Sequence, residues 1–210
     1  MEIHAPHQPI LTVKEALVHL GIVTIGILIA LSLEGLVERQ HHRNLVQEAN
    51  TNITNELRDN RNELQGFLKA LPKLRSNDLN ALQYLDAVSA HHPPEHGEMT
   101  LNFSRPDLSS ASWKTAQTIG ALGLMDYQDV KRYAAVYELQ DEFVRLQGNT
   151  IDALISAITM FQQNQAPDKL PAADLQTERE RILAVMSQLQ IQQQIGQELD
   201  QRYETVLSRH

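Results

Sequence analysis

Residues 16–33 read ALVHLGIVTIGILIALSL, an apolar run of eighteen residues without a charged side chain. As an α-helix this run spans about 27 Å, close to the thickness of the hydrocarbon core of a bilayer. Its polar residues are His19, Thr24 and Ser32. A buried core helix of this length normally carries a polar stripe, which this run lacks. We therefore expect a membrane-spanning helix over residues 16–37, preceded by a short tail at residues 1–15.

A cleaved signal peptide is the main alternative, because Ala30-Leu31-Ser32 matches a small-x-small cleavage site. The apolar run is longer than the usual core of a signal peptide and the helical pattern continues past it, which favours a retained signal anchor with one span. Basic residues are nearly balanced across the run, with Lys14 before it and Arg39 and Arg43 after it. Because a short tail before a first span usually stays inside, we expect the rest of the chain to lie across the membrane.

The helical pattern continues beyond the span, without a proline, as far as Leu71. Two rows repeat every seven residues: Leu57, Leu64 and Leu71, and Asn60, Phe67 and Leu74. This pattern predicts a stalk that leads from the membrane into the rest of the protein. Asn60 either fixes the register inside a helical seam or lies at a solvated edge, and both interpretations stay open. Pro72 is expected to end or kink the helix, because proline removes a backbone hydrogen bond.

Capping and loop signals in the sequence divide the rest of the body, which we take as residues 38–210, into further helices and loops. Ser76-Asn77-Asp78 is a cluster of N-cap residues and predicts the start of a short helix. Residues 91–110 contain three prolines and one glycine and lack a helical period, which indicates one long loop. A helix through Trp113, capped by Ser109 or Ser110, should follow.

Two long helices are predicted in the C-terminal part. Asp126 supplies an N-cap for the first, which should run to about Gln163. Its buried face is expected to hold Val130, Tyr133, Tyr137, Val144, Ile151, Leu154, Ile158 and Phe161. The second should begin near Ala172 and bury two rows: Leu175, Ile182 and Leu189, and Val185, Gln192, Leu199 and Val206. Because about eight residues join these helices, they should pack as a hairpin in an all-α antiparallel bundle.

Composition excludes several classes of function. The chain has 210 residues, of which 5% are aromatic, and no β-period is visible, so an all-β fold is disfavoured. It contains no cysteine, which excludes disulfides, cysteine zinc sites and a thiol nucleophile. A net charge of −8 argues against nucleic acid as a partner. We find no catalytic triad, phosphate loop or cofactor motif, and we expect no enzymatic activity and no cofactor.

Two polar or small-residue patterns lie in and beside the expected span. Gly26 and Ala30 form a small-xxx-small pair with Glu34 one turn further, a pattern that lets two membrane helices approach closely. The alternative is the ordinary abundance of glycine and alanine in spans. His41-His42-Arg43 follows the span and could meet lipid headgroups, or could be ordinary interfacial polarity.

Three aromatic residues and one histidine motif are the other candidate sites. Trp113, Tyr133 and Tyr137 fit core anchors at helical spacing, although they could also line a ligand pocket. His92-x-x-Glu95-His96 formally matches an inverted zinc-protease motif. Two prolines between the histidines make the required helix unfavourable. A solvated loop is therefore the leading interpretation, and metal binding by this loop is left open.

Two blocks resemble a bacterial family whose activity is not assigned. The first is LIALSLEGLVERQHHRNLVQEANTNITNEL at residues 28–57, together with the start MEIHAPHQPI, and the second runs from Ser112-Trp113-Lys114-Thr115-Ala116 through Gly120 to Tyr133 and Tyr137. The members of that family have a short tail, one span and an all-helical body. The resemblance implies a bacterial inner membrane and a periplasmic body, and it brings no catalytic residues.

The function expected from these observations is a non-enzymatic, membrane-anchored helical scaffold that interacts with other proteins. A periplasmic ligand-sensing or accessory subunit, acting through a membrane partner, is the alternative. The expected partners are the lipid bilayer, further copies of the chain and other membrane proteins. Self-association as a dimer or trimer should use the face that starts at Gly26.

Overall fold

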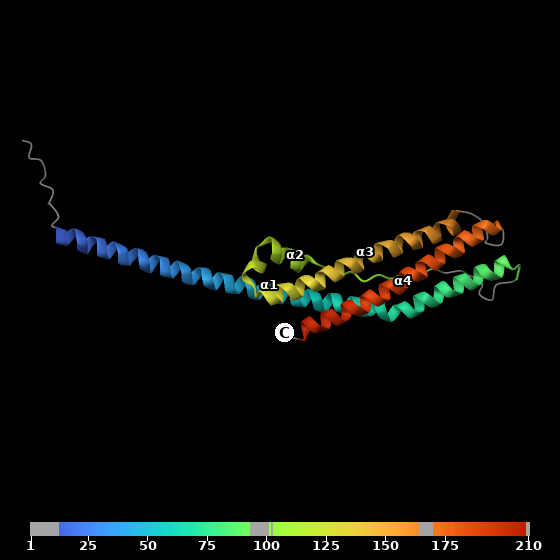
Figure 1. Cartoon of the computed structure of the whole chain (residues 1–210), viewed down its shortest axis with the longest axis horizontal. Coiled ribbons are helices and arrows are strands. Elements are labelled where there is room, and N and C mark those ends of the chain that lie inside the picture. The colour runs from blue at the N-terminus through green and yellow to red at the C-terminus, as the bar shows by residue number, and fades with distance from the viewer. Residues whose placement is uncertain (1–12, 93–100, 102, 164–169, 209–210) are drawn as a thin grey trace, which may run out of the picture. The chain divides into compact units, whose positions relative to one another are not determined.

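The protein is all-helical. The computed structural model describes residues 13–92, 101, 103–163 and 170–208, and these contain no strand. Of the described residues, 89% lie in helices. The elements are α1 (Val13–Ser89), α2 (Ala111–Thr118), the 3₁₀ helix η1 (Ala121–Leu124), α3 (Tyr127–Gln163) and α4 (Ala172–Leu207) (Figure 1). The chain divides into two compact units, unit 1 at Met1–Glu48 and unit 2 at Ala49–His210.

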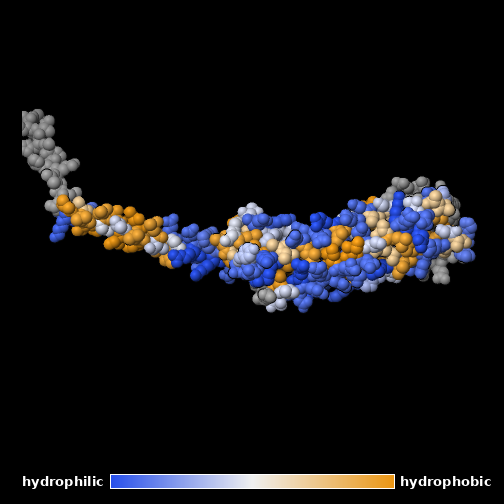
Figure 2. All heavy atoms as spheres, in the orientation of Figure 1, coloured by the Kyte–Doolittle hydropathy of each residue, from blue (hydrophilic) through white to orange (hydrophobic). Residues whose placement is uncertain are grey.

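Unit 1 contains one helical segment that is long and apolar enough to cross a membrane, as predicted. None of its eighteen-residue window is buried, and Figure 2 shows a mainly apolar surface on the visible face of this part of α1. The hydroxyls of Thr24 and Ser32 donate to backbone carbonyls one turn earlier, at 2.8 and 2.7 Å. These two hydroxyl groups are thus satisfied within the helix, as a nonpolar solvent requires.

The seven-residue rows predicted on α1 and α4 form much of the core of unit 2. All six residues of the α1 rows and all seven of the α4 rows are buried. Within the described residues, hydrogen bonds from Arg61 and Gln65 to Asp200, from Arg75 to Gln193, and from Arg179 to Asp86 join the two helices. Gly196 of α4 lies close to side chains of α1 and α3: a Cβ added at Gly196 would be 3.1 Å from Leu68 and 3.2 Å from Phe143.

Pro72 does not end α1, and the separate helix predicted after Ser76-Asn77-Asp78 does not form. The ribbon of α1 changes direction where teal turns to green, near residue 75 on the colour bar (Figure 1). Pro72 is exposed, so the carbonyl that loses its hydrogen bond can be hydrated. Leu71 and Leu74 on either side are buried and hold the helix together through packing.

The buried face of α3 differs in part from the predicted one. Val144 is 41% exposed, whereas Gln140, Gln147 and Thr150 are buried. The prediction followed apolar residues alone, but Gln140 and Gln147 occupy part of this face because they bond to other segments, and the Thr150 hydroxyl donates to the Leu146 carbonyl of the same helix. Phe161 belongs to residues whose side chains lie outside the description.

The connection from α2 to α3 follows the sequence signals closely. Gly120 between α2 and η1 has φ 76°, a left-handed conformation that glycine adopts without strain. The Asp126 carboxylate accepts a hydrogen bond from the Gln128 N–H at 2.8 Å, which confirms it as a cap of α3. The described part of the predicted loop at residues 91–110 is not helical, and residues 93–100 and 102 lie outside the description.

Candidate functional site

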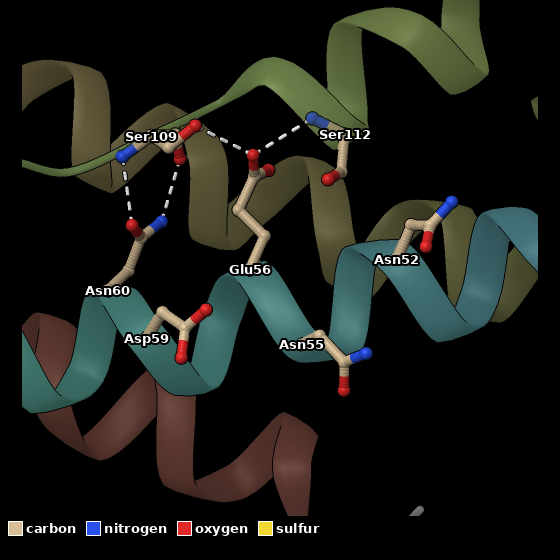
Figure 3. A pocket seen from close by; sticks show the side chains of 7 residues that line it. All are labelled: Asn52, Asn55, Glu56, Asp59, Asn60, Ser109 and Ser112. Carbon is tan, nitrogen blue, oxygen red and sulfur yellow. Dashed lines mark hydrogen bonds between the residues drawn. The ribbon is translucent and has the colours of Figure 1, made fainter.

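The best-defined polar cluster in unit 2 is centred on Glu56 of α1, at the N-terminus of α2 (Figure 3). One oxygen of its carboxylate accepts hydrogen bonds from the Ser109 hydroxyl and the Ser112 N–H, both at 2.8 Å. The other accepts a bond from the Tyr137 hydroxyl at 2.6 Å. An anion at the first turn satisfies backbone donors that have no partner within the helix. Glu56 thus caps α2 from a different helix.

Hydrogen bonds keep Glu56 ionised. Burial raises the pKa of its carboxyl, but the bonds from Tyr137, Ser112, Ser109 and Trp113 together lower it below its usual value. Burial, and then the bond to Glu56, raise the pKa of Tyr137 above its usual range. The pair is therefore a charged carboxylate and a neutral phenol over the physiological pH range.

A second set of buried amides fixes the segment that precedes α2. The side-chain amide of Asn60 donates to the Ser109 carbonyl at 2.7 Å and to the Gln140 side chain at 3.0 Å, and its oxygen accepts from the Ser109 N–H at 2.8 Å. Tyr203 of α4 donates to the same Gln140 oxygen at 2.7 Å. Of the two interpretations left open for Asn60, the buried one is confirmed, because its side chain is 2% exposed.

The three aromatic residues named by the sequence come together beside Glu56. Trp113 stacks on Tyr137, with ring centroids 5.3 Å apart, and meets Tyr133 edge-on at 6.5 Å. Both tyrosines are buried, whereas Trp113 is only half-buried. The tryptophan therefore joins α2 to α3 at the edge of the core. The rings contact one another, as packing anchors do.

A polar hollow of about 320 Å³ lies on the outer side of this cluster. Its lining consists of Asn52, Asn55, Glu56, Asp59, Asn60, Ser109 and Ser112 (Figure 3). Asn52, Asn55 and Asp59 are exposed and provide amide and carboxylate groups that can bond a small polar molecule. Glu56 forms the floor with both oxygens already engaged.

Sequence reasoning missed Glu56. A charged residue one turn after Ile53 and one turn before Asn60, on the buried stripe of a helix, was the available signal. The donors that compensate its burial come from residues 53 to 81 positions later, and no pattern local to α1 reveals them.

The remaining predicted residues lie in unit 1 or outside the description. Gly26, Ala30 and Glu34 are exposed. The rings of His41 and His42 are 6.4 Å apart, and the His42 Nε2 is 3.8 Å from a Glu38 carboxylate oxygen. Arg43 is exposed. The motif His92-x-x-Glu95-His96 extends into residues that the structure does not describe. Among the described residues, no three histidine, aspartate or glutamate side chains gather as metal ligands would.

Comparisons with known proteins give no relative. No protein-family model, no curated protein and no solved structure matches the chain. The resemblance to a bacterial single-span family therefore stays a prediction.

Proposed function

We propose that the chain is a non-enzymatic helical scaffold, anchored in a membrane by one span and offering its body to other proteins. One contrast carries this proposal. The apolar window of α1 is 0% buried, whereas the apolar rows of unit 2 are buried. A segment with so much uncovered apolar surface requires a nonpolar solvent, and a bilayer supplies one.

The body is proposed to be an antiparallel helical bundle. In support, Gln140 bonds to Tyr203 and Arg181 bonds to the Ser156 carbonyl, so residue numbers rise along α3 as they fall along α4. The same holds for α1 against α4. Long helices joined in this way provide extended, rigid surfaces, which suit a scaffold.

The chemistry of the Glu56 cluster supports a role without catalysis. A general acid or base works best when its pKa lies near the working pH. The pKa of Glu56 is lowered and that of Tyr137 is raised, so both are moved away from neutrality. Their hydrogen bonds hold α2 against α1 and α3, which is a structural task.

The proposed location is a bacterial inner membrane with a periplasmic body, as the family resemblance implies. Self-association is proposed at Gly26, Ala30 and Glu34, which are exposed and share one helix face. A Cβ added at Gly26 would meet no atom within 4 Å, so a second helix can approach there.

Membrane extraction and cysteine labelling test the anchor and its orientation. The full chain should stay in the membrane pellet at alkaline pH, and a chain that starts at residue 38 should not. Because the protein has no cysteine, a cysteine placed at the exposed Ser187 should react with an impermeant reagent once the outer membrane is open. Labelling only after lysis of the inner membrane would contradict the periplasmic body, and release of the full chain at alkaline pH would contradict the anchor.

A test of the scaffold role uses a photo-crosslinking residue at Leu79 or Leu183, which are exposed apolar positions of unit 2. We expect defined protein adducts at one of them, and a matched probe at the buried Leu85 should give none. The scaffold role would be contradicted if neither exposed position gave an adduct.

A second function, ligand sensing, is favoured by the polar hollow. Asn52, Asn55 and Asp59 lie on α1, the helix that also contains the membrane-length segment. A ligand in the hollow would thus act on a helix that continues into the proposed span. A small polar molecule that raises the melting temperature of the wild type but not of Asn55→Ala would support this function. An equal rise in both proteins would argue against it.

A further inference from the structure

Unit 2 has an apolar corner that the proposed scaffold role does not use. We call residues 111–132 the α2–α3 corner. Ile119 is 51% exposed, Leu124 41% and Tyr127 73%, within nine residues of sequence. The alternating residues Ala116, Ala121 and Met125 are buried. These three buried residues hold the backbone of the corner against the core, so the side chains of Ile119, Leu124 and Tyr127 stay on its outer side.

We propose that the α2–α3 corner docks on the surface of an anionic bilayer, with Ile119, Leu124 and Tyr127 inserted at headgroup depth. This inference rests on the membrane anchor of the proposed function, which would keep unit 2 close to a bilayer. Isoleucine and leucine are suited to this depth because their apolar side chains can bury at the boundary between headgroups and acyl chains. Tyrosine is suited to it because an aromatic ring with a polar tip fits the boundary between hydrocarbon and water.

The charge of the corner matches such a surface. Residues 111–132 contain Lys114, Lys131 and Arg132 against Asp126 and Asp129, a net charge of +1 in a chain of net charge −8. The acidic groups are engaged inside the corner: Asp126 accepts from backbone N–H groups of α3, and Asp129 pairs with Arg132. Lys114 and Lys131 are exposed and can meet anionic headgroups.

The corner also lies at the appropriate end of unit 2. The Tyr133 hydroxyl donates to the Asn50 side chain at 3.2 Å, so the start of α3 lies next to the start of unit 2. Contacts of α3 with α1 advance in the same direction, from Asn50 to Asn60 and Phe67. Tyr127, six residues before Tyr133, is therefore about 9 Å further toward the end where the chain enters from Glu48.

A bilayer fits this patch better than a protein does. Stable protein interfaces bury about 800 Å² on each partner, and three separate side chains flanked by lysines offer much less. For a surface already tethered to a membrane, weak insertion adds to the anchor and needs no large area.

Fluorescence quenching in nanodiscs tests the proposal on the full chain. Because the chain has no cysteine, single cysteines at positions 32, 127 and 144 can carry an environment-sensitive dye. Tyr127→Cys reports on the corner. Ser32→Cys reports on the proposed span, and Val144→Cys is the matched control, an apolar α3 position that is 41% exposed. The discs contain anionic lipid and lipids with a quencher near the headgroup. Circular dichroism checks that each variant folds.

The expected result is a blue shift and a loss of fluorescence at positions 32 and 127, with neither at 144. The effect at 127 should weaken in zwitterionic discs, at high salt and in the double variant Lys114→Glu, Lys131→Glu. Quenching at 32 without quenching at 127 would overturn the docking and leave the anchor intact. Absence of quenching at 32 would overturn the anchor and the docking together. A blue shift at 127 that lipid quenchers do not reduce would show a protein contact, and an effect unchanged by lipid charge would overturn the anionic surface.

Discussion

Replacing Asp78 by asparagine should remove a pH dependence from the stability of unit 2. Asp78 lies on the buried face of α1, is 1% exposed, and its Oδ2 has no hydrogen-bond partner within the described residues. Burial raises the pKa of its carboxyl from 3.8 to about 6. A charged carboxylate at this position is therefore unfavourable in the folded state, and asparagine of nearly the same shape avoids the charge.

The sign and the size of the effect follow from linkage between proton binding and folding. Well below pH 3.8, the pKa of the carboxyl in the unfolded chain, the group is protonated in both states and contributes no pH dependence. Between pH 4 and pH 6 the unfolded chain loses its proton first, so stability falls as pH rises. The change in pKa from 3.8 to about 6 corresponds to about 3 kcal/mol at 1.36 kcal/mol per pH unit. This loss should be complete above about pH 7 and should be absent from Asp78→Asn.

Urea unfolding of the full chain in a nonionic detergent can measure this effect at pH 4 and pH 8. Trp113, the sole tryptophan, reports on unit 2 through its stack on Tyr137. We expect the free energy of unfolding of Asp78→Asn, relative to wild type, to be about 2.5 kcal/mol more favourable at pH 8 than at pH 4, because the carboxyl of the unfolded wild type is already partly ionised at pH 4. Asp86→Asn, at an exposed pair with Arg179, is the control and should show less than about 1 kcal/mol. A difference between wild type and Asp78→Asn that does not change with pH would refute the reasoning.

Three further predictions concern α2 and the proposed span. Glu56→Gln should lower the free energy of unfolding by about 2–3 kcal/mol, because it replaces a charged acceptor of several hydrogen bonds. Since the pKa of Glu56 is lowered, the loss of stability in Glu56→Gln should shrink as pH falls through that pKa. Urea unfolding at several pH values measures this loss, and a loss that does not change with pH would contradict the role of the charge. Trp113→Ala should cost about 2 kcal/mol by circular dichroism, less than for a core tryptophan because the ring is half-buried; no change in melting temperature would contradict its packing role. Gly26→Leu should reduce the oligomer mass measured in mild detergent if the proposed contact exists, and an unchanged mass would exclude that contact.

The core of unit 2 could be predicted from the sequence where apolar spacing and burial coincide. The rows that start at Leu57 and Leu175 are buried throughout. Long helices that pack side by side bury one face along their whole length, and the apolar residues repeat on that face. Gln192 belongs to such a row and is buried without a partner for its Nε2 among the described residues. Periodicity predicted its position, but it could not predict whether its polar atoms would be satisfied.

The parts that spacing did not predict depend on long-range hydrogen bonds. Gln140 occupies a core position of α3 because its amide donates to the Ser109 carbonyl at 2.9 Å, and Gln147 bonds in the same way to the Pro106 carbonyl at 3.2 Å. Both acceptors belong to an irregular segment whose course the sequence does not reveal. Of the two outcomes predicted for Pro72, an end of the helix and a kink, the end does not occur, since burial of its neighbours outweighs the hydrogen bond that the proline removes.

Buried polar groups differ between the two ends of unit 2, and this difference affects how unit 2 can open. Around α2, Glu56 and Asn60 have donors and acceptors for their polar atoms. Further along, Asp78 and Glu178 each keep one buried oxygen without a hydrogen bond among the described residues. Burial raises the pKa of Glu178 to about 7, so ionisation of both groups weakens that region near neutral pH. Local opening follows the least stable contacts. We therefore expect the end of unit 2 that holds α2 to be the more rigid one, and we expect the packing of the opposite end to respond to protons.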